Sequence, residues 1–278
     1  MIIGGIIVLN GKVAVVTGGG GVLCSVFAKA LVEKGAKVAV IDINEEAAKN
    51  TAKKVGALPV VANVLDYESL ENAKKIVARE LGSCDILING AGGNSPKGTT
   101  TKDYFEPDDF NNSQIKTFFD LDQKGIEFVF NLNFLGTLMT TQVFAKDMIN
   151  KKGATIINIS SMNAFTPLTR IPAYSGAKAA ISNFTMWLAV HFSKVGIRVN
   201  AIAPVFFLTE QNRMLLTDSN GNYTERAKKI LSQTPMERFG DAEELVGTLL
   251  YLVNSNDSSF VNGVVIPVDG GFSAYSGV

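Results

Sequence analysis

Short apolar runs, mostly of β-branched residues, alternate with longer amphipathic segments along almost the whole chain. The apolar runs have the length and composition of strands buried on both faces, and they lie at residues 13–16, 37–41, 58–61, 85–88, 154–159, 197–202 and 264–268. The segments 22–34, 45–55 and 67–81 have helical periodicity, and Gly35 follows the first of them as a C-terminal cap. This alternation predicts an α/β fold of three layers, a Rossmann-type, doubly wound parallel sheet covered by helices on both faces.

One domain, residues 1–278, accommodates the pattern, since a chain of this size buries a sizeable core and shows no internal repeat. Two stretches interrupt the alternation. Residues 93–125 are rich in Thr, Lys, Asp, Asn and Phe, and residues 204–240 contain two short helical patterns. Both follow strands at their carboxyl ends, where sheets of this kind bind ligands, so we expect them to cover a substrate.

Charge and cysteine content narrow the class of protein. Basic and acidic residues balance at 26 each, which gives no reason to expect a nucleic acid or a membrane surface as partner. Cys24 and Cys84 form neither a metal-ligand spacing nor a disulfide framework, as is usual in a reducing cytoplasm. His191 is the only histidine, so no metal site is expected, and no apolar stretch reaches the length of a membrane span.

A glycine-rich turn, residues 17–24, lies between the first predicted strand and the first predicted helix. Glycines there allow the backbone to approach a pyrophosphate at the helix N-terminus, and the residues expected to contact it are Gly18, Gly20, Gly21, Val22 and Leu23. Asp42 ends the second strand, where a carboxylate accepts both ribose hydroxyls of an adenosine and repels a 2′-phosphate. The sequence therefore favours NAD over NADP as the cofactor.

Tyr174 and Lys178 stand four residues apart on one face of a predicted helix, and Ser161 lies thirteen residues before the tyrosine. A free phenol titrates near pH 10, and a neighbouring ammonium is expected to lower its pKa toward neutrality. A serine hydroxyl nearby can hold the oxygen that exchanges the proton. The three residues together predict proton transfer in alcohol–ketone chemistry.

In order along the chain, the glycine turn, Asp42, Asn89-Gly-Ala-Gly92, Ser161 and Tyr174-x-x-x-Lys178 resemble the motifs of the short-chain dehydrogenase/reductase family. The resemblance implies that Tyr174 is the acid–base residue and that Lys178 also binds the nicotinamide ribose. It implies that Asn133 holds a water that relays the proton, with Asn131 as the alternative. The further cofactor-binding residues that it implies are Asn63, Val64, Asn89, Ala91, Gly92 and Pro204, together with Tyr174 and Lys178 themselves.

The chain departs from the usual family motifs at several positions. The last two glycines of T-G-x-x-x-G-x-G are Val22 and Cys24, and the second asparagine of N-N-A-G is Gly90. Asn63 replaces a frequent aspartate, and Val205 replaces the glycine that usually follows Pro204. These departures concern the backbone around the cofactor and leave the expected fold unchanged.

Three stretches resemble the D-mannonate oxidoreductase (fructuronate reductase) branch of this family, namely residues 92–100, 118–122 with 134–137, and 267–277. That branch implies a sugar-acid substrate, and another polyol, sugar or 3-oxoacyl substrate remains the alternative. The carboxylate of a sugar acid needs a cation, for which Arg170, Arg213 and Lys97 are the candidates. The family also implies a homotetramer, and a non-catalytic dinucleotide sensor is the rival hypothesis.

Several aromatic residues are interpreted as structural. Phe118, Phe119, Phe128 and Phe130 are expected in the core, because no basic groove accompanies them as a base-stacking platform would require. Trp187 is expected to be buried at a sheet or subunit contact. Apolar helices at 177–192 and 241–253 suggest faces that are buried against another copy of the chain.

Overall fold

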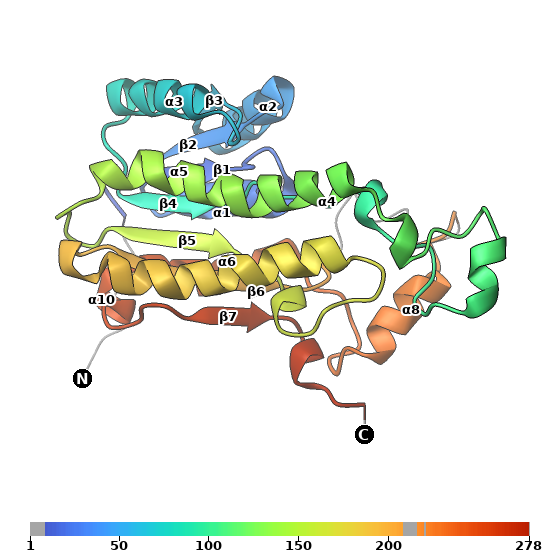
Figure 1. The fold of residues 1–278 in the computed structure, drawn as a ribbon. Coiled ribbons are helices and arrows are strands. Elements are labelled where there is room, and N and C mark those ends of the chain that lie inside the picture. Colours follow the sequence, from blue (N-terminus) through green and yellow to red (C-terminus); the bar gives the residue numbers. More distant parts are fainter. Residues whose placement is uncertain (1–8, 208–215, 220, 278) are drawn as a thin grey trace.

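The computed structural model describes residues 9–207, 216–219 and 221–277. Its centre is a sheet of seven parallel strands in the order β3-β2-β1-β4-β5-β6-β7 (Figure 1). The strands are β1 Val13–Thr17, β2 Lys37–Asp42, β3 Leu58–Val61, β4 Ile86–Asn89, β5 Thr155–Ile159, β6 Arg198–Pro204 and β7 Val265–Val268. The predicted doubly wound fold is confirmed, and the strand order reverses between β1 and β4.

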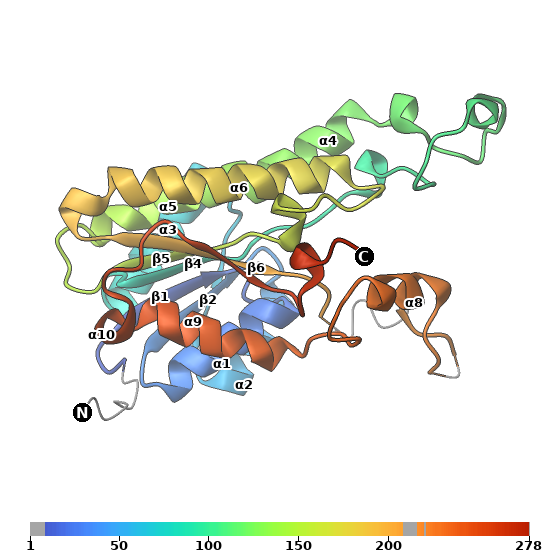
Figure 2. The same cartoon turned by 90° about the horizontal axis from the view of Figure 1, so that it is seen from below.

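Helices cover both faces of the sheet, which gives three layers (Figure 2). One face carries α1 Val22–Glu33, α2 Glu45–Val55, α9 Val246–Val253 and the short α10 Ser255–Ser258, and the other carries α3 Tyr67–Glu80, α4 Gln123–Phe130, α5 Gly136–Phe144 and α6 Pro172–His191. Two buried apolar clusters fill the spaces between these layers. Continuous apolar strands are what a sheet covered on both faces requires, since every side chain then enters a core.

A continuous helical stretch, Gln123–Asp147, combines α4, a π-helical turn at Asn131–Leu135, α5 and a terminal 3₁₀ turn. Its mean hydropathy of 1.2 reaches the value of a membrane span, and half of the apolar window is buried inside the fold. Burial of this kind is typical of a core helix in a globular domain, and here α4 packs on α6 and α5 packs on α3.

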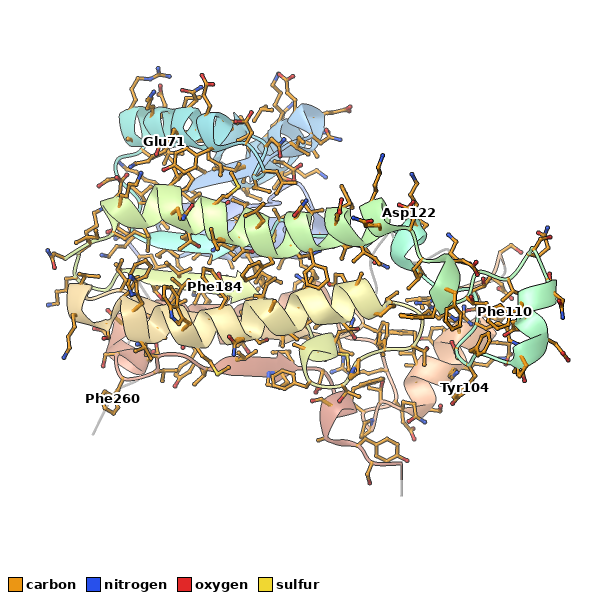
Figure 3. All side chains as sticks on the ribbon, in the orientation of Figure 1. Glu71, Tyr104, Phe110, Asp122, Phe184 and Phe260 are labelled. Carbon is orange, nitrogen blue, oxygen red and sulfur yellow. The ribbon has the colours of Figure 1, made fainter. Side chains whose placement is uncertain are left out.

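The segment 99–122, called the arm below, projects from the body of the fold beyond the carboxyl ends of the strands (Figures 1 and 2). Its Phe105, Phe110, Phe118 and Phe119 pack on one another with ring centroids 5.1 to 5.7 Å apart. Figure 3 shows Tyr104 and Phe110 at this end of the molecule. Helix α8, Glu225–Ser232, lies at the same end of the molecule.

The expectation that four phenylalanines lie in the core is wrong. Phe118 and Phe119 are 68% and 65% exposed, since the arm leaves the body and its rings contact chiefly each other. Phe128 and Phe130, at the end of α4, are 49% and 37% exposed, although the Phe130 ring lies close to Gly176 of α6. Trp187 is 56% exposed on the single chain and stacks on Phe184 and His191, so a contact with the sheet does not bury it.

Candidate active site

The site lies at the carboxyl ends of the strands around the reversal between β1 and β4, the position where open α/β sheets bind ligands. Thr17 ends β1 and Asn89 ends β4 opposite it. Ser161 follows β5, and Tyr174 and Lys178 are on the first turns of α6. The fold thus brings residues that are far apart in the sequence to one edge of the sheet.

The glycine turn has the geometry of a nucleotide cradle. Gly18 adopts a φ of +63°, which disfavours any larger residue, and Gly21 caps α1 without a side-chain hydrogen bond. No acidic residue occupies the first turn of α1, so its first amides and its positive dipole end suit an anion. The residues present therefore fit the pyrophosphate of a dinucleotide.

Asp42 lies directly against this turn. Its Oδ2 accepts a hydrogen bond from the Gly20 amide at 3.0 Å, and its Oδ1 accepts one from the Asn44 amide at 2.9 Å. A Cβ atom at Gly20 would lie only 2.9 Å from Asp42 Oδ2, so the glycine is required for this contact. The carboxylate is thus fixed beside the cradle, where it suits a ribose diol and disfavours a phosphate.

The loop after β4 is joined to the glycine turn by close contacts. Thr17 Oγ1 accepts hydrogen bonds from the Gly90 and Ala91 amides at 3.1 and 3.3 Å. A Cβ atom at Gly90 would lie 2.1 Å from Cys24 Sγ, so the cysteine sulfur occupies the space of a side chain at position 90. The two departures from the family motifs, Cys24 and Gly90, therefore compensate for each other sterically.

Three of the predicted cofactor residues use their side chains in contacts within the protein. The Asn89 amide donates to Thr141 Oγ1 at 3.0 Å and to Asn158 Oδ1 at 2.9 Å. Val64 is buried against Gly136, and Asn63 Oδ1 accepts from the Leu65 amide at 2.9 Å. These side chains shape the loops from within, which leaves their backbone atoms for a ligand at the strand ends.

Ser161, Tyr174 and Lys178 converge as the sequence predicts. Ser161 Oγ donates to the Pro204 carbonyl at 3.4 Å and accepts from the Asn163 amide at 3.3 Å. Lys178 is buried, its Nζ donates to the Ile159 carbonyl at 2.8 Å, and the same atom lies 5.5 Å from the centroid of the Tyr174 ring. The hydrogen bond to the end of β5 fixes the lysine beside the tyrosine.

The expectation that Lys178 lowers the pKa of Tyr174 is wrong for the chain alone. Burial raises the pKa of Tyr174 to about 12, and only the neighbouring Ser161 hydroxyl acts in the opposite direction. Burial also lowers the pKa of Lys178 to about 8, because the site disfavours its ammonium. Burial thus disfavours the charged form of both groups, so Tyr174 is a neutral phenol that can donate a proton.

Asn133 lies inside the π-helical turn and is fully buried. Its amide nitrogen donates to the Gly93 carbonyl at 2.7 Å, and its Oδ1 accepts from the Gly93 amide at 3.3 Å. A Cβ atom at Gly92 would lie 2.6 Å from Asn133 Oδ1 and 3.4 Å from Lys178 Nζ. Asn133 is therefore adjacent to Lys178, whereas Asn131 is on the exposed side of the turn. A π-turn at this point is typical of functional sites.

The three candidate cations for a substrate carboxylate differ in their surroundings. Arg170 Nε donates to Asp103 Oδ1 at 2.7 Å, so an internal carboxylate already pairs with it. Lys97 is exposed on the 3₁₀ turn Pro96–Gly98, which packs on α4, and its neighbour Gly98 lies close to Ala173, the residue before Tyr174. Arg213 lies outside the described residues.

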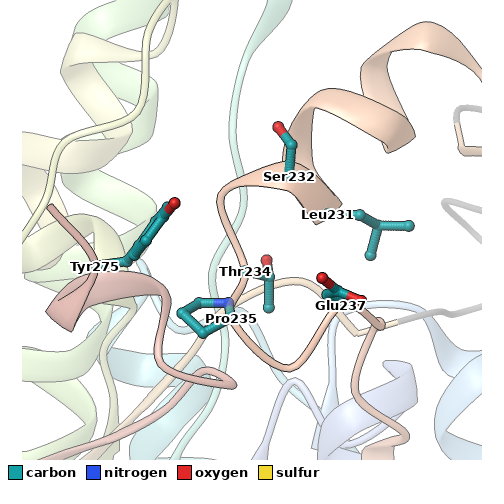
Figure 4. Close-up of a pocket in the computed structure, with 6 residues that line it drawn as sticks. All are labelled: Leu231, Ser232, Thr234, Pro235, Glu237 and Tyr275. Atoms are coloured by element: carbon teal, nitrogen blue, oxygen red, sulfur yellow. The ribbon is translucent and has the colours of Figure 1, made fainter. Parts of the chain in front are cut away.

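Two cavities lie near the segment 204–240. One, of about 290 Å³, lies between the end of α8 and the C-terminal residues, and it is lined by Leu231, Ser232, Thr234, Pro235, Glu237 and Tyr275 (Figure 4). The other, of about 110 Å³, includes Val205, which directly follows Pro204. Neither cavity contains any of the predicted catalytic residues, although the first is lined largely by the segment 204–240, which is expected to cover a substrate.

Known proteins are similar to this chain over nearly its whole length. The model of the short chain dehydrogenase family matches residues 12–220. A crystal structure from Haemophilus influenzae, provisionally named D-mannonate oxidoreductase and holding bound NAD, is 60% identical, covers 98% of both chains and has a TM-score of 0.93. An uncharacterized oxidoreductase, UxuB, of Bacillus subtilis is 49% identical over 97% of this chain and 98% of its own. The 2-dehydro-3-deoxy-D-gluconate 5-dehydrogenase of Dickeya dadantii is 32% identical over 96% of this chain and 97% of its own.

Proposed function

The chain belongs to the short-chain dehydrogenase family, and on that basis we propose that it is an NAD-dependent oxidoreductase acting on a sugar acid. The substrate pair that we propose is D-mannonate and D-fructuronate, interconverted as alcohol and ketone. One observation carries the chemistry: Ser161, Tyr174 and Lys178 converge beside a glycine cradle that suits a dinucleotide. A proton donor next to a hydride carrier is what reduction of a ketone requires.

The protein's own residues supply binding, orientation and the proton. When bound, the nicotinamide would supply hydride transfer, as acceptor from the alcohol carbon in its oxidised form and as donor to the ketone carbon in its reduced form. Tyr174 Oη gives its proton to the carbonyl oxygen during reduction, and the Ser161 hydroxyl orients that oxygen by a hydrogen bond. Lys178, with a pKa near 8, restores the proton to the tyrosine. Asn133, next to Lys178 across Gly92, connects this path to solvent.

The choice of NAD rests on the fixed position of Asp42. Its carboxylate is held by the Gly20 and Asn44 amides, which leaves it no freedom to turn away from a 2′-phosphate. The NAD in the Haemophilus relative supports the same cofactor, because that protein is 60% identical to this chain. The proposed cofactor contacts are the glycine turn, Asp42 and the loop after β4.

The sugar-acid class rests on the relatives. The names of the Haemophilus structure and of the Dickeya enzyme both refer to sugar acids. Among the described candidates, Lys97 suits the substrate carboxylate better than Arg170, because Asp103 already pairs with the arginine. The residue that follows it, Gly98, lies close to Ala173 at the start of α6, which carries Tyr174.

The test is a substrate panel with the purified chain. NADH oxidation is followed at 340 nm with D-fructuronate, other keto sugar acids of five and six carbons, uncharged keto sugars and 3-oxoacyl thioesters. We expect D-fructuronate to give the highest kcat/KM, and NADPH to support less turnover than NADH. Turnover of the thioesters without turnover of any keto acid would refute the substrate assignment.

We also propose that copies of the chain associate into a homotetramer, as the family resemblance implies. Met186, Trp187 and Val190 form an exposed apolar strip on α6, and they are 47%, 56% and 76% exposed. Exposed apolar strips of this kind are usual at protein interfaces. Light scattering of the purified protein measures the subunit number directly, and a monomer at micromolar concentration would contradict the proposal.

A further inference from the structure

One carboxylate, that of Asp103, joins three segments at the substrate side of the sheet. Its Oδ1 accepts from Arg170 Nε at 2.7 Å and from Thr169 Oγ1 at 3.0 Å, and its Oδ2 accepts from Lys229 Nζ. The Asp103 side chain is only 16% exposed. We call Asp103, Thr169, Arg170 and Lys229 the Asp103 clasp.

The clasp connects the arm to the loop that lies between Ser161 and Tyr174 in the sequence. Thr169 and Arg170 belong to the loop 165–171, which joins the turn after Ser161 to the helix of Tyr174. Arg170 has a φ of +71°, a conformation that costs a non-glycine residue free energy. The Arg170 carbonyl also accepts from the Thr100 amide at 2.9 Å, so two contacts with the arm hold this strained residue.

Helix α8 is connected to the segments around Ser161 and Tyr174 by two sets of contacts, one apolar and one polar. Its apolar face, Ala227, Ile230 and Leu231, packs in a cluster with Phe206. Phe206 follows Pro204 by two residues, and the Pro204 carbonyl accepts from Ser161. On the other side, Lys229 of α8 reaches the loop before Tyr174 through Asp103.

One set of contacts of α8 is apolar and the other is polar, and this difference determines which of the two can separate. The apolar side buries Ala227 and Ile230, so separating it would expose them to water. The polar side consists of one carboxylate between two cations at the surface, and water can replace each of these contacts. The Lys229 and Arg170 hydrogen bonds hold the pKa of Asp103 well below its usual range, so the carboxylate is charged at every pH of ordinary use.

We propose that Asp103 is a positioning residue whose clasp holds α8 closed against the loop between Ser161 and Tyr174, with the apolar side of α8 as the hinge. Opening then requires only the polar contacts to break. The clasp also engages the charge of Arg170 in holding the loop before Tyr174, which favours Lys97 over Arg170 as the cation for a substrate carboxylate. This proposal depends on the proposed function in one respect only, namely that the substrate which the closed α8 covers is a ketone.

The first test is the kinetics of Asp103→Asn, which keeps the size of the side chain and removes its charge. We expect the KM for the keto acid to rise about tenfold, with kcat within about twofold and the Kd for NADH unchanged. Asp103→Glu restores part of the lost affinity for the keto acid. Asp108→Asn, at an exposed position of the same arm, is the matched control and leaves all three constants unchanged.

The second test does not depend on knowing the substrate. Hydrogen–deuterium exchange compares Asp103→Asn with the unaltered protein, both saturated with NADH. We expect faster exchange confined to residues 225–232 and 165–171, with the strands unchanged. Unchanged exchange in both segments, or a uniform increase along the chain, would overturn the clasp. Failure of every keto acid as substrate would refute the proposed function and leave this result standing.

Discussion

The contact between Gly90 and Cys24 gives the sharpest steric prediction. In Gly90→Ala, the new Cβ would lie 2.1 Å from Cys24 Sγ and 2.8 Å from the Thr17 carbonyl oxygen. Non-bonded carbon contacts lie at about 3.5–4.0 Å, so both neighbours must move. Overpacking of a buried site costs about 1–3 kcal/mol of unfolding free energy. We therefore expect the melting temperature to fall by about 5 °C.

A double variant tests whether the contact with Cys24 causes the loss of stability in Gly90→Ala. Cys24→Ala removes the sulfur and leaves its Cβ 3.7 Å from the new methyl group, an ordinary contact. The pair Cys24→Ala with Gly90→Ala then recovers about 1 kcal/mol relative to the sum of the single changes. The Thr17 carbonyl still crowds the methyl group, so the recovery is partial.

Thermal unfolding, followed by circular dichroism with and without NAD, measures all three variants. Gly247→Ala is the control, because a Cβ atom there meets nothing within 4 Å. We expect it to be neutral or slightly stabilising. Strictly additive losses in the double variant would refute the argument that Cys24 and Gly90 compensate for each other.

Two further predictions concern the cofactor and the pH dependence. Asp42→Ala lowers the affinity for NADH about tenfold and reduces the preference for NADH over NADPH. Fluorescence titration with each cofactor measures the two Kd values, and an unchanged ratio between them would contradict the role of the carboxylate. The kcat/KM for ketone reduction is constant at neutral pH and falls above about pH 8. Burial lowers the pKa of Lys178 to about 8, so the lysine loses its proton above that pH. In Lys178→Arg the residual activity lacks this alkaline decline, because a guanidinium stays protonated; a decline at the same pH in the arginine variant would assign it to another group.

Much of the fold could be predicted from the chain itself, because strands covered on both faces are marked by continuous apolar runs. The predicted strand 85–88 is shifted by one residue to Ile86–Asn89, and the predicted helix 67–81 ends at Glu80. The order of the motifs also predicted the convergence of Ser161, Tyr174 and Lys178, since carboxyl ends of parallel strands meet at one edge.

Features that depend on distant neighbours could not be predicted. The pairing of Arg170 with Asp103 spans 67 positions, and nothing in the local sequence distinguishes a paired arginine from one that is free for substrate. The aromatic composition of the arm is typical of a buried segment, yet the arm projects away from the core. The pKa values of Tyr174 and Lys178 depend on how far the folded protein excludes water, which spacing along a helix does not reveal.

The most direct test of the central claim is Tyr174→Phe, which removes one oxygen and keeps the ring. Single-turnover reduction of D-fructuronate by bound NADH is compared with the unaltered protein, and the Kd for NADH is measured in parallel. We expect the rate of reduction to fall by about 10²–10⁴-fold with the Kd unchanged, since the phenol acts on the substrate oxygen. A Tyr174→Phe protein that reduces the ketone at a comparable rate would contradict the account.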